Sequence, residues 1–333
     1  MVREEIVNIL KSTSEEEAKA LFAKAREARD KCAGGRIFMY GFVYFSTYCK
    51  NDCSFCFYRK DNKIDRYRKN EKETAAIAKS LVESGVHLID LTLGEDEYYT
   101  GNRCQRLVDV VHMIKDELDT PVMVSPGVVP DDSINALADS GADFYALYQE
   151  THNRELFGKR RLNQSYDDRM HAKLHAASRG MLIEEGIMTG IGETAEDIAD
   201  SIIAMGEEGA SQMRAMSFIP QEGSPMEKDE TPDRMLELKA IAIMRILYPH
   251  VLIPASLDVD GIEGLHDRLN AGANVVTSII PPQSGCNGVA MPRDEIDEGG
   301  RTVEEATAII KDMGLTPGTK EELADYLKEL KQR

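Results

Sequence analysis

Three cysteines lie close together in the first sixth of the chain, in the run Cys49-Lys-Asn-Asp-Cys53-Ser-Phe-Cys56. A cubane iron–sulfur cluster has four irons, so three thiolates leave one iron without a protein ligand. An open coordination position is typical of a catalytic metal centre, whereas structural metal sites are closed. The C-x3-C-x2-C spacing also differs from zinc ribbons and from the four-cysteine run of bacterial ferredoxins. It predicts a [4Fe–4S] cluster held by Cys49, Cys53 and Cys56.

The remaining cysteines, Cys32, Cys104 and Cys286, are scattered singly and predict no auxiliary cluster. The absence of a paired-cysteine framework and of a signal-peptide pattern, together with an oxygen-sensitive cluster, indicates a reducing compartment, the cytoplasm. No apolar run approaches ~18 residues, so we expect no membrane span. The net charge of −18 argues against a nucleic acid partner, because binding phosphates requires a basic field.

Strand-like and helical runs alternate along most of the chain, and these elements must position the cysteines. Residues 3–31 read as helical, with a capping box from Ser14 to Glu17 and a stop at Gly34-Gly35. The predicted strands are 37–45, 87–93, 121–125, 144–149, 181–189, 212–218, 251–255 and 274–277. The predicted helices between and after them are 73–84, 103–117, 132–139, 166–178, 195–207, 232–247, 263–270, 303–313 and 320–330.

Eight strand–helix repeats without a linker predict an α/β fold, a closed (β/α)8 barrel of the TIM type. We expect this barrel domain to comprise residues 36–333 and an N-terminal helical extension to comprise residues 1–35. A doubly wound open sheet is the alternative.

In a parallel barrel, the chemistry belongs to the loops at the carboxyl ends of the strands. The cysteine loop follows the first predicted strand, as this rule requires. The second strand contains Asp90 inside an apolar run, where an aspartate either contacts a substrate or is satisfied by a nearby backbone turn. Arg214 lies in the sixth strand, and Ser256 and Asp258 follow the seventh, so we expect these side chains near the same mouth.

The flanks of the cysteine run carry a family resemblance. An aromatic residue, Phe55, directly precedes the last cysteine, and the chain here resembles the radical S-adenosylmethionine (SAM) enzymes. The runs at 148–151 (YQET), 165–169 (SYDDR) and 218–225 (FIPQEGSP) are similar to the biotin synthase and hydrogenase-maturase branch. Over almost its whole length the chain is similar to the methylornithine synthases, the lysine mutases of pyrrolysine biosynthesis. Matching runs lie at 44–51, 89–96, 146–156, 220–223, 253–258 and 269–274.

The resemblance implies a second cofactor, SAM, which chelates the open iron through its amino and carboxylate groups. It assigns the ammonium of SAM to Glu150 and the carboxylate to Arg169, with Arg161 as an alternative, and these charges are complementary. Aromatic side chains of the cysteine loop would contact the adenine. The cofactor contacts expected from the resemblance are Phe55, Tyr58, Ser125, Glu150, Arg161 and Arg169.

The resemblance also implies a small-molecule substrate, L-lysine, with its carboxylate on Arg214. Its ammonium groups are expected on Asp90, Ser256 and Asp258, since a buried charge needs a partner. A 5′-deoxyadenosyl radical would abstract a hydrogen from lysine, whose fragments recombine as 3-methylornithine. An external one-electron reductant, flavodoxin-like or ferredoxin-like, would be the protein partner. Two alternatives stay open: a hydrogenase-maturase-like or biotin-synthase-like enzyme, and a metal-binding redox carrier, which would need four protein ligands.

Overall fold

Eight parallel strands form the centre of the computed structural model, which describes residues 1–290, 296 and 299–333. Their order around the sheet is β6-β5-β4-β3-β2-β1-β8-β7, and every named pairing is parallel. Between β6 and β7 the ring closes through a parallel bridge of Gln212 and Leu252. The predicted (β/α)8 barrel is therefore confirmed, and the alternative of a doubly wound open sheet is wrong. The strands are β1 (Arg36–Ser46), β2 (Leu88–Leu93), β3 (Val122–Ser125), β4 (Phe144–Ala146), β5 (Leu182–Thr189), β6 (Gln212–Ser217), β7 (Pro254–Ser256) and β8 (Val275–Ile279).

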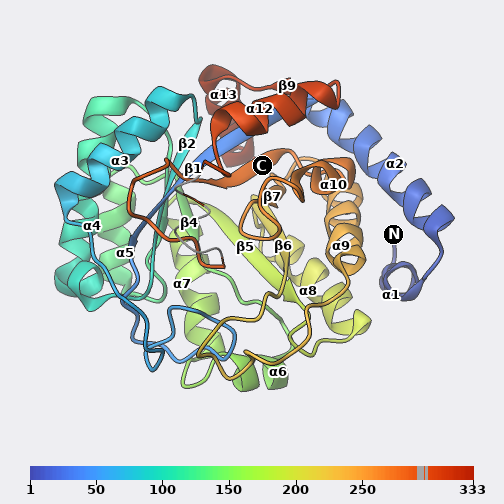
Figure 1. Cartoon of the computed structure of the whole chain (residues 1–333), viewed down its shortest axis with the longest axis horizontal. Helices are drawn as coiled ribbons and strands as arrows, with labels where there is room; N and C mark the ends of the chain where they lie inside the picture. The colour runs from blue at the N-terminus through green and yellow to red at the C-terminus, as the bar shows by residue number, and fades with distance from the viewer. Residues whose placement is uncertain (291–295, 297–298) are drawn as a thin grey trace.

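The helices surround the strands as an outer layer (Figure 1). None of the described helices is long and apolar enough to cross a bilayer. The helices that follow β1 are α3 (Glu71–Ser84), α4 (Glu97–Leu118), α5 (Asp131–Asp139), α6 (Arg154–Arg160), α7 (Tyr166–Ser178), α8 (Ala195–Glu207), α9 (Arg234–Leu247), α10 (Leu265–Asn270), α12 (Val303–Asp312) and α13 (Lys320–Lys331). A short strand, β9 (Thr316–Pro317), pairs with the start of β1.

Some predicted boundaries are wrong. The fourth strand ends at Ala146, not at residue 149, because the Gln149 amide donates to the Glu185 side chain instead of to the backbone of β5, and the chain then turns at Glu150, whose φ is 66°. The seventh strand is Pro254–Ser256, three residues later than predicted at its start. Helix α6 was not predicted, since seven residues are too few for a clear periodicity. Helix α4 begins earlier than predicted but has a kink at 101–104.

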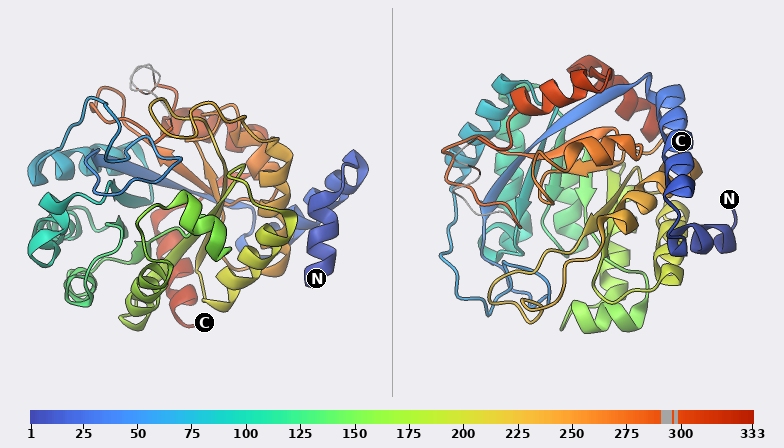
Figure 2. Two further views of the ribbon diagram at one scale, coloured as in Figure 1. Left: turned by 90° about the horizontal axis from the view of Figure 1, so that it is seen from below. Right: turned by 45° about the vertical axis from the view of Figure 1, so that its right-hand side comes forward.

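The N-terminal helices α1 (Arg3–Lys11) and α2 (Glu15–Ala33) lie against the barrel, where α1 packs on α8 and α2 on α9 (Figures 1 and 2). Their buried side chains belong to the same hydrophobic cluster as the barrel helices. Ser14 caps α2 by accepting from the Glu17 amide. The predicted capping box is not reciprocal, because the Ser14 amide donates to the Ser12 hydroxyl. Gly34 ends α2 at a φ of 57°, as predicted.

Alternating side chains of β1 divide the core into two parts. Ile37, Met39 and Val43 belong to the cluster between strands and helices. Phe38, Tyr40, Phe42 and Tyr44 belong to a second cluster that also contains leucines of α13. The Phe38 and Tyr326 rings lie 5.9 Å apart, so α13 closes the amino end of the barrel. A functional site is therefore expected at the opposite, carboxyl end of the barrel.

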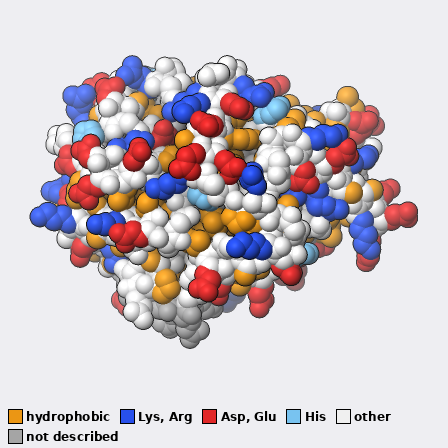
Figure 3. Space-filling view, turned by 90° about the horizontal axis from the view of Figure 1, so that it is seen from above, with side chains coloured by type: hydrophobic (Ala, Val, Ile, Leu, Met, Phe, Trp, Pro, Cys, Tyr) orange, Lys and Arg blue, Asp and Glu red, His pale blue; other side chains and the backbone are white. Residues whose placement is uncertain are grey.

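The outer surface carries charges of both signs. On the face shown in Figure 3, acidic and basic side chains are interspersed, with hydrophobic side chains between them. The negative net charge is therefore not gathered into one patch on this face.

Candidate active site

A cavity lies at the carboxyl ends of the strands, where the barrel rule places it. Most of the predicted site residues line it: Cys49, Cys53, Cys56, Phe55, Tyr58, Ser125, Glu150, Arg161, Arg169, Arg214 and Asp258. Asp90 and Ser256 lie one layer deeper. The Ser125 hydroxyl donates to Asp90 Oδ1 at 3.3 Å, and the Asp258 amide donates to Ser256 Oγ at 3.3 Å. The structure thus brings all the predicted site residues to one end of the barrel.

The three cysteines of the loop after β1 share this cavity, whereas Cys32, Cys104 and Cys286 do not line it. Cys53 is buried, and its sulfur accepts hydrogen bonds from Gln164 Nε2 at 3.0 Å and from Arg161 Nη1 at 3.6 Å. Burial raises the pKa of the Cys56 thiol well above its usual range, and the neighbouring Cys53 and Cys49 thiols raise it further. Iron ions would reverse this effect, because a bound cation stabilises thiolates.

Glu150 and two arginines form a charged group beside the cysteines. The Glu150 carboxylate accepts from Arg161 Nη2 at 2.8 Å. Arg169 Nη2 donates to the Tyr148 carbonyl at 2.7 Å, and Arg161 Nη2 donates to the same oxygen at 2.9 Å. Burial raises the pKa of Glu150, whereas both arginines lower it. Arg161, which the sequence placed second to Arg169, is thus in direct contact with Glu150.

The backbone at Glu150 is held in the left-handed region by its neighbours. Its amide donates to the Gly186 carbonyl and its carbonyl accepts from the Met188 amide, both at 3.0 Å. These bonds to β5 turn the side chain of Glu150 into the cavity, where it lines the wall. A non-glycine residue with positive φ costs roughly 1–3 kcal/mol, so the surrounding structure offsets this strain.

Sequence reasoning missed two polar residues of this group. Gln164 donates to Cys53 and accepts from Arg169 Nη1 at 3.1 Å, which links the cysteine loop to α7. Glu95 lies 3.5 Å from Arg169 Nη1 and 3.2 Å from Lys50 Nζ. The run Gly94-Glu95-Asp96 after β2 was a signal for Glu95, whereas Gln164 lies in a loop without a recognisable pattern.

Arg214 has a buried counter-ion that the sequence did not predict. Its Nε donates to Glu184 Oε1 at 2.8 Å, and its Nη1 donates to Thr277 Oγ1 at 3.1 Å. The Tyr148 hydroxyl donates to the other Glu184 oxygen at 2.9 Å. Glu184 lies within β5 and is fully buried, so its carboxylate points into the barrel and compensates the arginine.

Asp258 is also paired before any substrate binds. Its carboxylate accepts from Arg301 Nη1 at 2.6 Å, and from the hydroxyls of Tyr44 and Ser278, each at 2.7 Å. Burial alone would raise the pKa of Asp258, but Arg301 and these donors hold it below its ordinary value. Arg301 could not be predicted from the sequence, because it lies 43 positions away from Asp258, beyond β8.

Asp90, at the centre of β2, forms no ion pair with any residue that the structure describes. Oδ1 accepts from the hydroxyls of Thr92 at 2.8 Å and Ser125, whereas Oδ2 has no hydrogen-bond partner among the described residues. Burial, together with the neighbouring Glu184 carboxylate, raises the pKa of Asp90 to about 7. Side-chain hydroxyls, rather than the backbone turn that the sequence allowed, therefore satisfy Asp90 Oδ1.

Comparison with known proteins identifies the family. Residues 43–203 match the model of the radical SAM superfamily. The 3-methylornithine synthase of Methanosarcina acetivorans is 42% identical over 320 residues, which cover 96% of this chain and 91% of the relative. The chain belongs to the 3-methylornithine synthase family of the radical SAM superfamily. A crystal structure of methylornithine synthase (PylB) has a TM-score of 0.93 and 40% identity, and covers 98% of this chain and 96% of that one.

A hydrogenase-maturation protein is a more distant relative. The [FeFe] hydrogenase maturase subunit HydE of Thermotoga maritima is 33% identical over 261 residues, which cover 77% of this chain and 74% of the relative. The lower identity and coverage do not favour the maturase-like alternative. The resemblance to the methylornithine synthases is therefore confirmed.

Radical SAM proteins use a [4Fe–4S] cluster and SAM, and the residues of the cavity fit both groups. Three thiols at one wall suit a cluster with one open iron, and Gln164 and Arg161 supply donors to a thiolate sulfur. A buried glutamate beside two arginines suits an amino acid moiety, since it offers an acceptor for an ammonium and planar donors for a carboxylate.

Proposed function

We propose that this chain converts L-lysine into 3-methylornithine, as a radical SAM mutase of pyrrolysine biosynthesis. One observation carries the proposal: the cavity that contains the three thiols also reaches an inner group of charged side chains complementary to lysine. The names of the relatives with 42% identity and of the superposed crystal structure support the same activity.

The inner charges can be counted pair by pair. Arg214 is compensated by Glu184, and Asp258 by Arg301, so these two pairs contribute no net charge. Asp90 is the remaining charged residue after these two pairs, and it adds one negative charge when it is ionised. Lysine carries two ammonium groups and one carboxylate, a net charge of +1. The group is therefore neutralised by lysine, whereas an anionic substrate would leave buried negative charge uncompensated.

Each polar side chain then has a task in binding. Arg214 would hold the lysine carboxylate, because its guanidinium offers two parallel donors. Asp258 and Ser256 would accept hydrogen bonds from one ammonium group and Asp90 from the other. When bound, the cluster and SAM supply a carbon-centred radical that removes a hydrogen atom from the substrate. The protein residues fix which carbon is presented to this radical, and the buried walls exclude water.

The electron for SAM cleavage must come from outside the cavity. We propose a flavodoxin-like or ferredoxin-like one-electron donor and, since the cluster is oxygen-sensitive, a cytoplasmic location.

The direct test is anaerobic incubation of cluster-loaded protein with SAM, dithionite and ¹³C-labelled lysine. Substrate and product are isomers of equal mass, so they must be separated by chromatography and identified by fragmentation. Labelled 3-methylornithine is the expected product. Formation of 5′-deoxyadenosine with lysine left unchanged would retain radical SAM chemistry but contradict the lysine assignment.

Glu150→Gln is expected to reduce SAM cleavage by at least ~100-fold, because an amide keeps the shape but loses the charge that faces the SAM ammonium and Arg161. Production of 5′-deoxyadenosine measures the effect, and Arg169→Ala should act similarly. Arg160→Ala is the matched control, since Arg160 Nε donates to the Ile191 carbonyl and its side chain does not line the cavity. An equal loss at Arg160 would contradict the placement of the SAM site.

Lysine affinity is expected to rise with pH through about 7, because Asp90 must be ionised to accept an ammonium and its pKa is raised to about 7. The ionised fraction, and with it the affinity, should increase roughly tenfold between about pH 6 and pH 8. Calorimetry of lysine binding to the SAM-loaded enzyme without reductant measures this change. Asp90→Asn should bind lysine more weakly and with a flat pH profile; a flat profile in the wild-type enzyme would exclude Asp90 from this role.

A further inference from the structure

Helices α5 and α7 are joined on the outside of the barrel by a series of polar contacts at regular spacing. Each contact pairs residues that are 40 positions apart, and successive contacts are four residues, or about one helical turn, apart along α5 and along α7 with its C-cap residue Arg179. The three pairs are Asp131 with His171 at 2.9 Å, Asn135 with His175 at 3.0 Å, and Asp139 with Arg179 at 2.9 Å.

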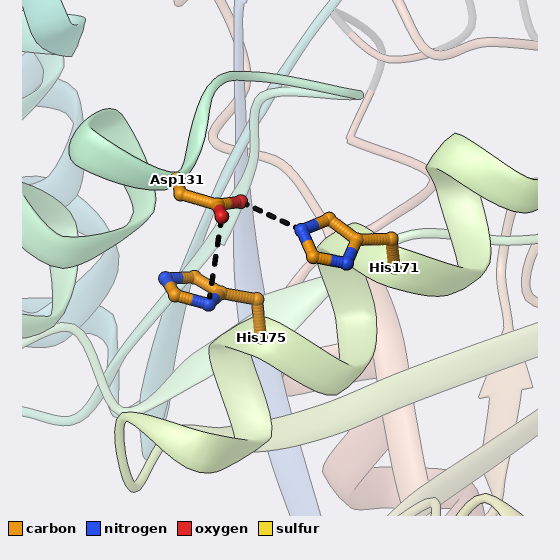
Figure 4. Close-up of side chains that lie close together, drawn as sticks. All are labelled: Asp131, His171 and His175. Carbon is orange, nitrogen blue, oxygen red and sulfur yellow. Dashed lines mark hydrogen bonds and ion pairs between the residues drawn. The ribbon is translucent and has the colours of Figure 1, made fainter.

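Three of these residues, Asp131, His171 and His175, form a compact group of side chains that commonly bind metal ions. His171 and His175 are four residues apart on α7 and lie on one face, and Asp131 is the first residue of α5 (Figure 4). Asp131 Oδ1 lies 2.9 Å from His171 Nε2, and Asp131 Oδ2 lies 3.9 Å from His175 Nδ1. One ligand atom from each residue lies within 4.8 Å of the others. In a tetrahedral zinc site with bonds of about 2.0–2.1 Å, ligand atoms are about 3.3 Å apart, so little movement is needed.

Asn135 orients the second imidazole. Its side-chain oxygen can only accept, so the 3.0 Å contact requires His175 Nε2 to carry the proton. In the neutral ring, Nδ1 then presents its lone pair toward Asp131 Oδ2, which is also an acceptor. Two acceptors that face each other across 3.9 Å are an arrangement that a cation between them stabilises. A histidine whose other ring nitrogen donates to an oxygen is also the usual arrangement around protein-bound metals.

We propose that Asp131, His171 and His175 bind one divalent zinc ion, with water at the remaining position. Imidazole and carboxylate ligands suit this borderline metal. The three side chains do not line the cavity, so the ion would bind on the outer surface of the barrel. There it would join α5 to α7. Their side chains are 49%, 64% and 23% exposed, so the ion can enter without unfolding.

A second group of similar residues carries no such proposal. His152, Glu185 and Glu208 also bring ligand atoms together. Their ligand atoms already have partners within the protein, because the Lys173 ammonium pairs with both Glu185 and Glu208, and His152 Nε2 contacts Glu208 Oε1 at 3.0 Å. The zinc site is thus assigned only to the α5–α7 surface.

The test is an anaerobic titration of cluster-loaded protein with zinc chloride at pH 8, followed by calorimetry and by the visible absorbance of the cluster. The wild-type protein should bind one zinc ion and melt at a higher temperature with zinc, while the cluster absorbance stays constant. Single variants His171→Ala and His175→Ala should each bind at least about tenfold more weakly, and Asn135→Ala about tenfold more weakly, as is typical for a residue that orients a ligand.

His112→Ala is the matched control, because His112 is exposed on the neighbouring helix α4 and belongs to no group of metal ligands among the described residues. This variant should bind zinc like the wild-type protein. The proposal is overturned if the wild-type protein binds no zinc. It is also overturned if the double variant His171→Ala/His175→Ala binds zinc equally well, with or without loss of the cluster absorbance, since the thiols or another site would then hold the ion.

Discussion

Replacing Cys53 by alanine is expected to abolish the iron–sulfur cluster and, with it, all SAM cleavage. Cys53 is the buried member of the three, and its sulfur is the one that accepts from Gln164 and Arg161. Two remaining thiols cannot hold three irons of a cubane, so the loss should be complete rather than partial. Iron and sulfide analysis after anaerobic reconstitution measures the cluster, and 5′-deoxyadenosine measures the cleavage; about four irons per chain are expected in the wild-type protein.

Cys104→Ala is the control for this variant. Cys104 is also buried, but its sulfur contacts the Thr100 carbonyl of its own helix and does not line the cavity. It should keep the full cluster and full cleavage activity. A Cys53→Ala protein that retains about four irons would remove the basis of the cofactor assignment.

Asp258→Asn is expected to eliminate 3-methylornithine formation while SAM binding persists. The variant removes a charge that faces both the buried Arg301 and, in the proposed complex, a lysine ammonium. Loss of one partner of a buried pair costs about 3–5 kcal/mol, which corresponds to a decrease of roughly two to four orders of magnitude. The expected SAM contacts come from other parts of the chain, such as the cysteine loop and α7, so SAM affinity should remain near the wild-type value. Product analysis, SAM binding and thermal unfolding should be measured on the same preparation.

Asp260→Asn tests the same chemical change two residues further along. Asp260 pairs with Arg234 through two bonds of 2.7 Å and does not line the cavity. This variant should retain lysine turnover. Near-wild-type turnover in Asp258→Asn, or an equal loss in Asp260→Asn, would show that Asp258 does not hold the substrate.

The sequence predicted the parts of the site that follow from order along the chain. Because the strands are parallel, the carboxyl ends that bear Cys49, Glu150, Arg214 and Asp258 meet at one mouth, and the structure places them there. Spacing within one loop was enough to indicate the cluster. The fold was predictable for the same reason, since long periodic segments carry a clear signal.

The counter-ions were not predictable in this way. Glu184 lies in β5 and Arg301 follows the last strand, and only the folded chain brings them to Arg214 and Asp258. A pairing between residues that are 30 or 43 positions apart leaves no periodic trace in one sequence. The turn at Glu150 was missed because the bonds that hold its φ at 66° come from β5, not from its own neighbours.

The closure between β6 and β7 has a consequence for how the barrel responds to its ligand. Among the described residues, this pair of strands is joined by a bridge at Leu252 rather than by a longer ladder, and Pro254 has no amide hydrogen to extend it. Above the bridge, the Arg214 side chain reaches from β6 past β7 to Thr277 on β8. A substrate carboxylate that takes over this guanidinium would exchange a bond that closes the ring for a contact with the ligand. We therefore expect local opening between β6 and β7 to depend on whether lysine is bound. Amide hydrogen exchange in β6 and β7 should change on lysine binding more than exchange in β2 and β3.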